Sequence, residues 1–93
     1  MIGSFRDKRT AAIFAGFAVR GFSFQMQERA RTKLLLVDAA KLLDDLRRPP
    51  GNRLEALAGE RKGQHSIRVN DQWRICFKWR DGDALNVELV DYH

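Results

Sequence analysis

A run of polar and titratable side chains closes the chain, which ends in Asp91, Tyr92 and His93. A carboxylate, a phenol and an imidazole placed together can move protons or steady a developing charge. Histidine side chains in general titrate near neutral pH, so His93 could act as a general base or a general acid, with Asp91 orienting it or acting beside it. Tyr92 could donate a hydrogen bond or stack on a base. Taken alone, such an ending also fits an ordinary frayed terminus.

A second group of candidates is cationic. Positions 47–80 hold nine Lys and Arg against three Asp and Glu, whereas positions 81–93 hold four carboxylates and no Lys or Arg. Guanidinium groups bind phosphate oxygens in pairs and stay charged at every relevant pH. Lys and Arg are also ordinary on the solvent-facing side of a sheet. The candidates for phosphate contacts are Arg68, Arg74, Lys78 and Arg80, with Arg61 and Lys62 in the preceding loop.

Acid and base groups beside a basic surface indicate chemistry on a polyanion. RNA fits this pattern because it carries its own nucleophile, the 2′-hydroxyl group. A ribonuclease must supply a base for the hydroxyl proton, an acid for the leaving 5′ oxygen, and cations at the phosphate. We therefore predict a small ribonuclease in which Asp91, Tyr92 and His93 act together with Arg74.

The length, net charge and composition of the chain limit the other classes of protein to which it could belong. The 93 residues fit a single domain over positions 1–93, and a net charge of +5 fits a polyanionic partner. A lone cysteine, Cys76, excludes an intramolecular disulfide, and no apolar run is long enough to span a membrane. Two histidines and one cysteine without ligand spacing predict no metal site. Since the opening residues lack the apolar stretch of a signal peptide, we expect a cytoplasmic protein. We also expect that it needs no cofactor.

Helices are predicted in the first half of the chain, after a short strand at positions 2–5. Asp7 can cap a first helix over positions 8–19. A second helix is expected over positions 23–46, ending before Pro49, because proline cannot supply the required N–H group. The buried stripe of that helix is predicted to contain Leu35, Ala39, Leu42 and Leu46, with Leu36 and Leu43 beside it.

Strands are predicted at positions 65–69, 73–79 and 85–90, where apolar residues alternate with a period of two. Short turns make the sheet mainly antiparallel, and the two helices can cover one of its faces. This is an α+β domain. We expect three-residue turns, because this register pairs apolar residues under the helices, whereas a two-residue turn at Asp81-Gly82 places Phe77 opposite Asn86. The expected pairs are Val69 with Trp73, Ile67 with Ile75, Phe77 with Val87 and Trp79 with Leu85.

The opposite, open face of this sheet is expected to carry the candidate site. Tyr92 would lie diagonally across from Arg74, within reach of a long side chain, and Cys76 would lie on the same face. His65 is placed on the core side, opposite Phe77. The residues expected on the open face are Gln64, Arg68, Arg74, Lys78, Asn86 and Tyr92.

Two segments resemble a known toxin family. They are PPGNRLEALAGERKGQHSIRVNDQWRICFKW at positions 49–79 and NVELVDYH at positions 86–93. Both are similar to HigB toxins of the RelE/ParE superfamily, and the pattern GQHSIRVNDQWRICF followed by VELVDYH is specific to the HigB-type branch. The opening MIGSF and the two predicted helices agree, so the resemblance spans the chain and implies a RelE-like fold.

The resemblance also implies a function. HigB proteins are toxins of type II toxin–antitoxin modules that enter the ribosomal A site and cut translated mRNA without a metal. A HigA-like helix-turn-helix antitoxin is the implied partner, and the complex is expected to repress its own operon by binding operator DNA. The family's terminal Asp-Tyr-His corresponds to Asp91, Tyr92 and His93, and its central-strand arginine corresponds to Arg74.

One position departs from the family pattern. Glu55 stands where some members have an active-site histidine, and Ala58 stands where such members have a nearby lysine. A carboxylate can accept a proton but carries no positive charge, so we count Glu55 among the candidate catalytic residues and expect slower or differently tuned cleavage. Two alternatives remain: a ParE-like toxin that inhibits gyrase, and a catalytically weak co-repressor that only binds an antitoxin. The terminal acid and base groups favour the endonuclease.

Overall fold

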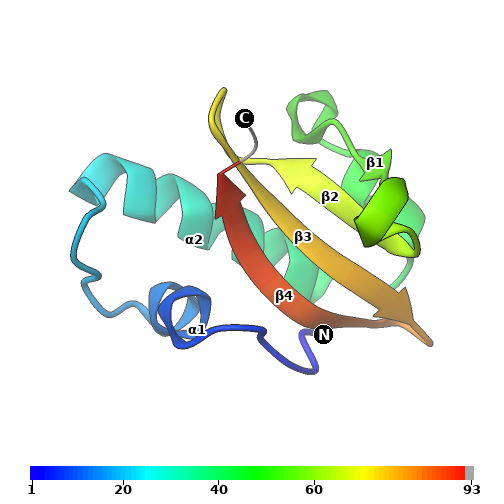
Figure 1. The fold of residues 1–93 in the computed structure, drawn as a ribbon, viewed down its shortest axis with the longest axis horizontal. Coiled ribbons are helices and arrows are strands. Elements are labelled where there is room, and N and C mark those ends of the chain that lie inside the picture. The colour runs from blue at the N-terminus through cyan, green and yellow to red at the C-terminus, as the bar shows by residue number, and fades with distance from the viewer. Residues whose placement is uncertain (92–93) are drawn as a thin grey trace.

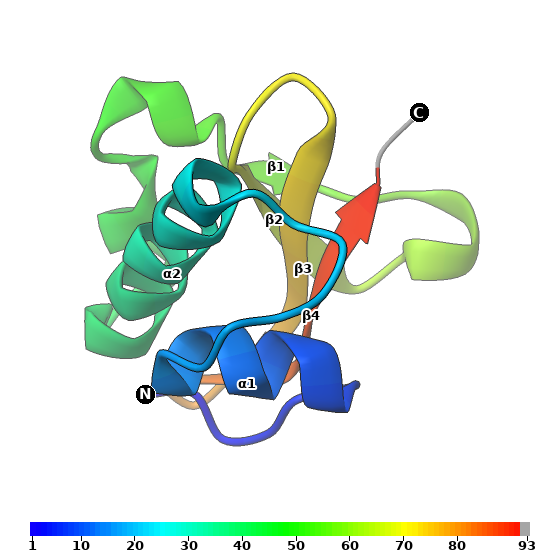
Figure 2. The ribbon, with the colours of Figure 1, turned by 90° about the vertical axis from the view of Figure 1, so that its left-hand side faces the viewer.

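The computed structural model describes residues 1–91 and has two helices packed on one face of a four-stranded sheet (Figures 1 and 2). The strands follow the order β1-β2-β3-β4, each antiparallel to its neighbour, which confirms the predicted α+β class. No helix within residues 1–91 has the length and apolar character needed to cross a membrane. The elements are α1 (Lys8–Ala15), α2 (Phe24–Ala39), β1 (Glu55–Ala56), β2 (Gln64–Arg68), β3 (Trp73–Arg80) and β4 (Asp83–Asp91).

Helix α1 begins where predicted and ends earlier. The Asp7 carboxylate accepts a hydrogen bond of 2.6 Å from the backbone N–H of Thr10, which is the predicted cap. The helix stops at Ala15 because Gly16 adopts a left-handed conformation, with φ of 91°, and its N–H group closes the last turn. The predicted end at position 19 was therefore wrong.

Helix α2 also ends before the predicted position. It begins after Ser23, whose hydroxyl caps the first turn, and it stops at Ala39 instead of continuing to position 46. Beyond it, the Asp45 carboxylate accepts hydrogen bonds of 3.0 Å from the backbone N–H groups of Lys41 and Leu42, which favours a tight turn over a further helical turn. These two bonds hold the pKa of Asp45 below its usual value.

The apolar stripe of α2 was predicted on the wrong side. Ala30, Leu34 and Val37 are fully buried against the sheet, whereas Leu35 is 42% exposed and Leu42 is 66% exposed. Three consecutive leucines at positions 34–36 leave the helical phase ambiguous, and Leu42 is no longer on the helix.

The hairpins differ in their turns. Ile67 lies opposite Ile75, and the N–H of Val69 donates to the carbonyl of Trp73 at 2.9 Å, which confirms the predicted loop between β2 and β3. Between β3 and β4 the prediction was wrong, because Asp81 and Gly82 form a two-residue turn with φ of 50° and 86°. This is the turn geometry whose twist matches that of a hairpin.

A β-bulge corrects the register after this tight turn. Trp79 lies opposite Ala84, not Leu85, but one extra residue of β4 is accommodated where the register shifts between Cys76 and Lys78. Asn86 takes φ of 54° at this point. Beyond the bulge Ile75 lies opposite Leu89, which is the register that the apolar pattern predicted.

The first residues lie parallel to β4 rather than forming a regular strand. Single bridges join Ile2 to Ala84 and Phe5 to Val87. The N–H of Gly3 donates to the carbonyl of Ala84 at 2.8 Å. The predicted short strand is therefore present as two isolated contacts, and β4 is flanked by the first residues on one side and β3 on the other.

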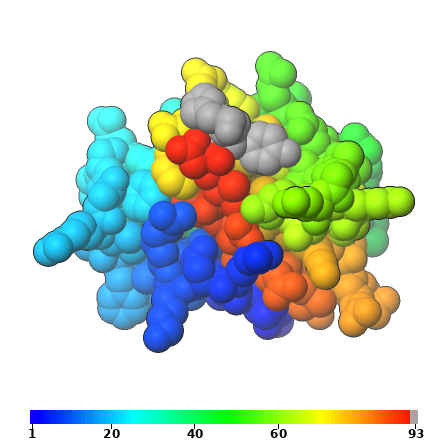
Figure 3. Space-filling model, in the orientation of Figure 1, coloured from blue at the N-terminus to red at the C-terminus, as the bar shows by residue number. Residues whose placement is uncertain are grey.

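The outer face of the sheet is less open than predicted. Cys76 is fully buried, because the segment before β2 lies alongside β4 and covers this region (Figure 3). Within that segment, the guanidinium of Arg61 pairs with the carboxylate of Glu88 at 3.2 Å. Burial raises the pKa of the Cys76 thiol, so this cysteine has the character of a packed side chain rather than of a nucleophile.

Candidate active site

Arg74 is a buried cation whose position is fixed by two neighbouring segments. It lies on β3 with 8% of its surface exposed. Its Nε donates to the hydroxyl of Ser66 on β2 at 2.8 Å, and its Nη2 donates to the carbonyl oxygen of Arg53 at 2.6 Å. Nη2 also donates to the carbonyl oxygen of Ser66 at 3.3 Å. A guanidinium held by these hydrogen bonds is preorganised, so it can stabilise charge without first being ordered.

Glu55 lies beside this guanidinium. It is the first residue of β1 and lies opposite Ser66, the same residue that holds Arg74. The Oε2 atom of Glu55 lies 3.9 Å from Nη2 of Arg74, and the Glu55 side chain is 53% exposed. The structure therefore brings together two predicted site residues that are far apart in the sequence, one a possible proton acceptor and the other a cation.

The two residues line a cleft of about 580 Å³. Its lining residues come from β1, β2 and β3, from the loop between β2 and β3, and from the segment that precedes β1. Three arginines and two carboxylates contribute to its walls, so the cleft is positive on balance and suited to an anion. Its lining residues are Gly51, Arg53, Glu55, Arg68, Asn70, Asp71 and Arg74.

Arg68 reaches this cleft from β2. It lies directly opposite Arg74, an arrangement of like charges that costs energy unless anions lie nearby. Asp71, in the loop that follows β2, forms an ion pair with the guanidinium of Arg68, while Glu55 lies near Arg74. Each of the two adjacent arginines therefore has one carboxylate beside it, and a bound phosphate could take the place of a carboxylate.

Asp91 lies at the end of β4, opposite Trp73. Its carboxylate accepts a hydrogen bond of 2.9 Å from the side-chain amide of Gln72, in the same loop that supplies Asn70 and Asp71 to the cleft. Tyr92 and His93 lie outside the described residues. The expected approach of Tyr92 to Arg74 therefore stays a prediction.

The remaining predicted RNA-contacting residues lie away from the cleft. Lys78 is exposed and four positions further along β3 than Arg74, a separation of about 13 Å along a strand. Arg80 is at the far end of that strand, opposite Asp83. Arg61 is paired with Glu88 on the outer face of the sheet, and Lys62 is exposed next to it. None of these four residues lines the cleft.

Three residues that shape the site were not predicted. Ser66 could have been found, because it alternates with Arg68 along β2 and so shares the outer face with Arg74. Arg53 acts through its backbone carbonyl, which a sequence does not reveal. Asn52 is fully buried, and its side-chain amide donates to the carbonyls of Leu46 and Arg48 at 3.2 and 3.1 Å. It thereby fixes the turn that presents Arg53.

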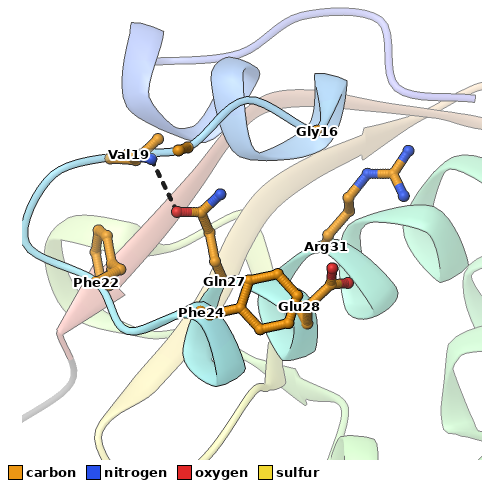
Figure 4. Close-up of a pocket in the computed structure, with 8 residues that line it drawn as sticks. Gly16, Val19, Phe22, Phe24, Gln27, Glu28 and Arg31 are labelled. Atoms are coloured by element: carbon orange, nitrogen blue, oxygen red, sulfur yellow. Dashed lines mark hydrogen bonds between the residues drawn. The ribbon is translucent and has the colours of Figure 1, made fainter.

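A second hollow, of about 400 Å³, lies between the helices and is supported by its own hydrogen bonds (Figure 4). The side chain of Gln27 accepts from the N–H of Val19 at 2.8 Å and donates to the carbonyl of Phe17 at 2.6 Å. Phe22 and Phe24 contribute apolar walls. These contacts stabilise the connection between α1 and α2, and we assign no chemistry to this hollow.

The arrangement around Arg74 can bind a phosphate and accept a proton. Arg74 and Arg68 supply charge-assisted hydrogen-bond donors, and the half-exposed carboxylate of Glu55 is a base within reach of a group bound at Arg74. Within residues 1–91, His, Cys, Asp and Glu side chains do not converge in threes on a possible metal site.

Comparison with known proteins agrees with the resemblance stated above. Residues 3–93 match the family described as "RelE-like toxin of type II toxin-antitoxin system HigB". The chain is 34% identical to "Endoribonuclease HigB" of Proteus vulgaris over 93 residues, covering 100% of both chains. It is 58% identical to "Toxin HigB-1" of Vibrio cholerae over 57 residues, a match that covers 61% of this chain and 60% of that relative.

A solved structure shares the fold. A chain of the YoeB–YefM complex from Staphylococcus aureus superposes with a TM-score of 0.63 at 15% identity, covering 100% of this chain and 98% of that one. This likeness concerns the architecture alone. Because the family match extends over nearly the whole sequence, the chain belongs to the HigB family of RelE-like toxins of type II toxin–antitoxin systems.

Proposed function

We propose that this protein is a ribosome-dependent endoribonuclease, and that it cuts translated mRNA at the cleft around Arg74. The observation that carries the proposal is the anchored guanidinium of Arg74, with the carboxylate of Glu55 only 3.9 Å away. The name of the full-length Proteus vulgaris relative, an endoribonuclease, supports the same activity. A protein that only binds a partner has no need for a base beside a preorganised phosphate-binding cation.

The proposed reaction uses the substrate's own nucleophile. A base, Glu55 or His93, takes the proton of the 2′-hydroxyl group, and the 2′ oxygen attacks the adjacent phosphorus. The bond from phosphorus to the 5′ oxygen breaks, and an acid, His93 or Tyr92, protonates that leaving oxygen. The products are a 2′,3′-cyclic phosphate and a 5′-hydroxyl end. Arg74 stabilises the extra negative charge on the phosphate oxygens in the transition state.

The proposed partners follow from the type of module. A HigA-like helix-turn-helix antitoxin would inhibit the toxin and bind operator DNA as a complex with it. The ribosomal A site would hold the mRNA, and we place the protein in the cytoplasm, where translation occurs. Positioning of the mRNA by the ribosome could supply much of the rate acceleration that a small cleft with few catalytic groups does not provide.

The test is to map mRNA 5′ ends in a translating extract that contains the protein. Cuts at fixed positions within codons are expected from the wild type; His93→Ala should abolish them and Arg74→Ala should strongly reduce them, while the fold survives. Lys8→Gln, a change of an exposed cation on α1, is the matched control and should cut normally. Signs of DNA damage without cuts would instead indicate a gyrase inhibitor, and the absence of both would indicate a binding protein. Either result would overturn the proposal.

A further inference from the structure

We propose that α2 carries a second phosphate site, formed by Arg29 and Lys33 together with Arg68, which holds the RNA strand as it leaves the cleft at Arg74. This inference rests on the proposed function, since it extends the same RNA-binding surface. These α2 residues were not among the RNA contacts predicted from the sequence, which lay on the strands and on the loop before β2.

One face of α2 forms the wall next to the cleft. Met26, Arg29 and Lys33 share this face, because residues three and four positions apart are neighbours on a helix. The side-chain amide of Asn70, which lines the cleft, contacts the sulfur of Met26 at 3.3 Å. The ammonium group of Lys33 donates to the side-chain oxygen of Asn52 at 2.6 Å. Arg29 lies between Met26 and Lys33 along this face, and it lines a separate hollow on α2 instead of the cleft itself.

The connection between Lys33 and the catalytic cation is short. Asn52, the partner of Lys33, is followed directly by Arg53, whose carbonyl oxygen accepts the 2.6 Å hydrogen bond from Arg74. On the other side of Asn52, Gly51 lines the cleft. A strand bound at Arg74 that passes over this turn therefore arrives at Lys33.

The surface beyond the turn is hollowed and polar. A hollow of about 300 Å³ is lined by Glu28, Arg29, Thr32 and Lys33. Arg29 and Thr32 are exposed, and both can donate hydrogen bonds to a phosphate oxygen. Glu28 contributes the one carboxylate of this lining and bounds the positive surface on that side.

The charges in this region favour an anion. Burial lowers the pKa of Lys33, and the neighbouring positive charges of Arg29 and Arg68 lower it further. Three cations placed this closely repel one another, and a bound phosphate relieves the repulsion. An RNA backbone suits the site better than an acidic protein segment does, because the site continues a cleft that already fits a phosphate and RNA presents phosphates at regular intervals.

The test measures binding of 2′-O-methyl RNA, which lacks the nucleophile and cannot be cleaved, over a series of salt concentrations. A short RNA fills only the cleft at Arg74, whereas a longer one also reaches α2. For the longer RNA, Lys33→Gln and Arg29→Gln should each lower the slope of log affinity against log salt by about 0.7, the value for one phosphate contact on a single strand. Neither variant should change the binding of the short RNA. Lys8→Gln serves as the control, and it should match the wild type with both RNAs.

Several outcomes would overturn this inference. One is a salt slope that is unchanged in both variants, and another is an equal loss of affinity for the short and the long RNA. A third comes from measuring polyglutamate binding in parallel: variants that bind polyglutamate more weakly but RNA as well as the wild type would identify an acidic protein as the occupant. Arg29→Gln keeps the test decisive if Lys33→Gln disturbs the turn at Asn52. Wild-type cleavage of mRNA with unchanged slopes would refute only the second site. Full cleavage by Arg74→Ala would refute the proposed function, whatever the slopes.

Discussion

The Nη2 atom of Arg74 lies 2.6 Å from the carbonyl oxygen of Arg53 and donates a hydrogen bond to it. This bond joins β3 to the turn that precedes β1, and Glu55 follows that turn directly. Arg53 itself is held in a left-handed conformation, with φ of 45°. The distance between the proposed base and the proposed phosphate-binding cation therefore depends on the geometry of this one turn.

Replacing Arg74 should separate its catalytic role from its structural role. We expect Arg74→Ala to slow cleavage, because the transition state loses about 2–4 kcal/mol of stabilisation. It should also lower the free energy of unfolding by about 1–3 kcal/mol, because Ser66 and the carbonyl of Arg53 lose a buried partner. Arg74→Lys keeps the charge but cannot make both bonds. Urea unfolding and mRNA cleavage measure the two effects, with Arg80→Ala as the control on the same strand. Wild-type cleavage by Arg74→Ala would contradict the assignment.

Changing Glu55 tests whether a carboxylate is the base. Glu55→Gln has nearly the same shape and cannot accept the proton, so cleavage on translating ribosomes should slow. Glu55→His restores a group that titrates near neutral pH and should raise the rate above that of Glu55→Gln. Since this side chain is 53% exposed, neither change should alter the unfolding midpoint appreciably. If both variants cleave at the wild-type rate, Glu55 has no part in the chemistry.

The bulge at Asn86 should respond to backbone preference rather than to side-chain contacts. Asn86 is exposed and takes φ of 54°, a conformation that β-branched residues strongly disfavour. We expect Asn86→Val to lower the free energy of unfolding by about 1–2 kcal/mol. Asn86→Gly should leave it unchanged or slightly higher. Urea denaturation of the pair measures the difference, and equal values for valine and glycine would show that the bulge carries no strain.

Asp45 should contribute to stability in a pH-dependent manner. Its pKa is lower in the folded protein than the usual value of 3.8, because the backbone N–H groups of Leu42 and Lys41 stabilise the carboxylate. The contribution is therefore present above about pH 4 and is lost as the pH falls through the folded-state pKa. Asp45→Asn should differ in stability from the wild type at neutral pH and converge with it in acid. Denaturation over a pH series checks this, with Glu60→Gln as the control. A difference that does not vary with pH would contradict it.

Periodicity in the sequence was enough to predict the fold class and the order of the two helices and the three long strands, whereas the two-residue strand β1 (Glu55–Ala56) was not predicted. The cap at Asp7 was readable because a capping side chain acts within the next few residues. The end of α2 was not readable, since it depends on Asp45 competing for backbone N–H groups beyond the helix. The predicted register of β4 was wrong in its first half, because the tight turn at Asp81 shifts the pairing by one residue. The bulge at Asn86 then shifts it back.

Some of the predicted charged side chains lie together in the structure, but the groups that hold them in place were not predicted. Arg74, Arg68 and Glu55 were found from residue type and family resemblance, and they line one cleft in the structure. The acceptors that fix Arg74 are a hydroxyl and two backbone carbonyls, and such groups occur all along the chain. Their partnership becomes visible only when β1 and β2 are placed side by side.

The position of β4 has a consequence for how the newly made protein matures. This strand bonds to residues 1–6 on one edge and to β3 on the other, and its Leu89 N–H is held by the Thr10 hydroxyl at 3.0 Å. Contacts between segments so distant in the chain form slowly, because a long loop must close first. A nascent chain whose β4 is still inside the ribosomal tunnel cannot complete its sheet, so the toxin does not reach its folded form until that segment emerges.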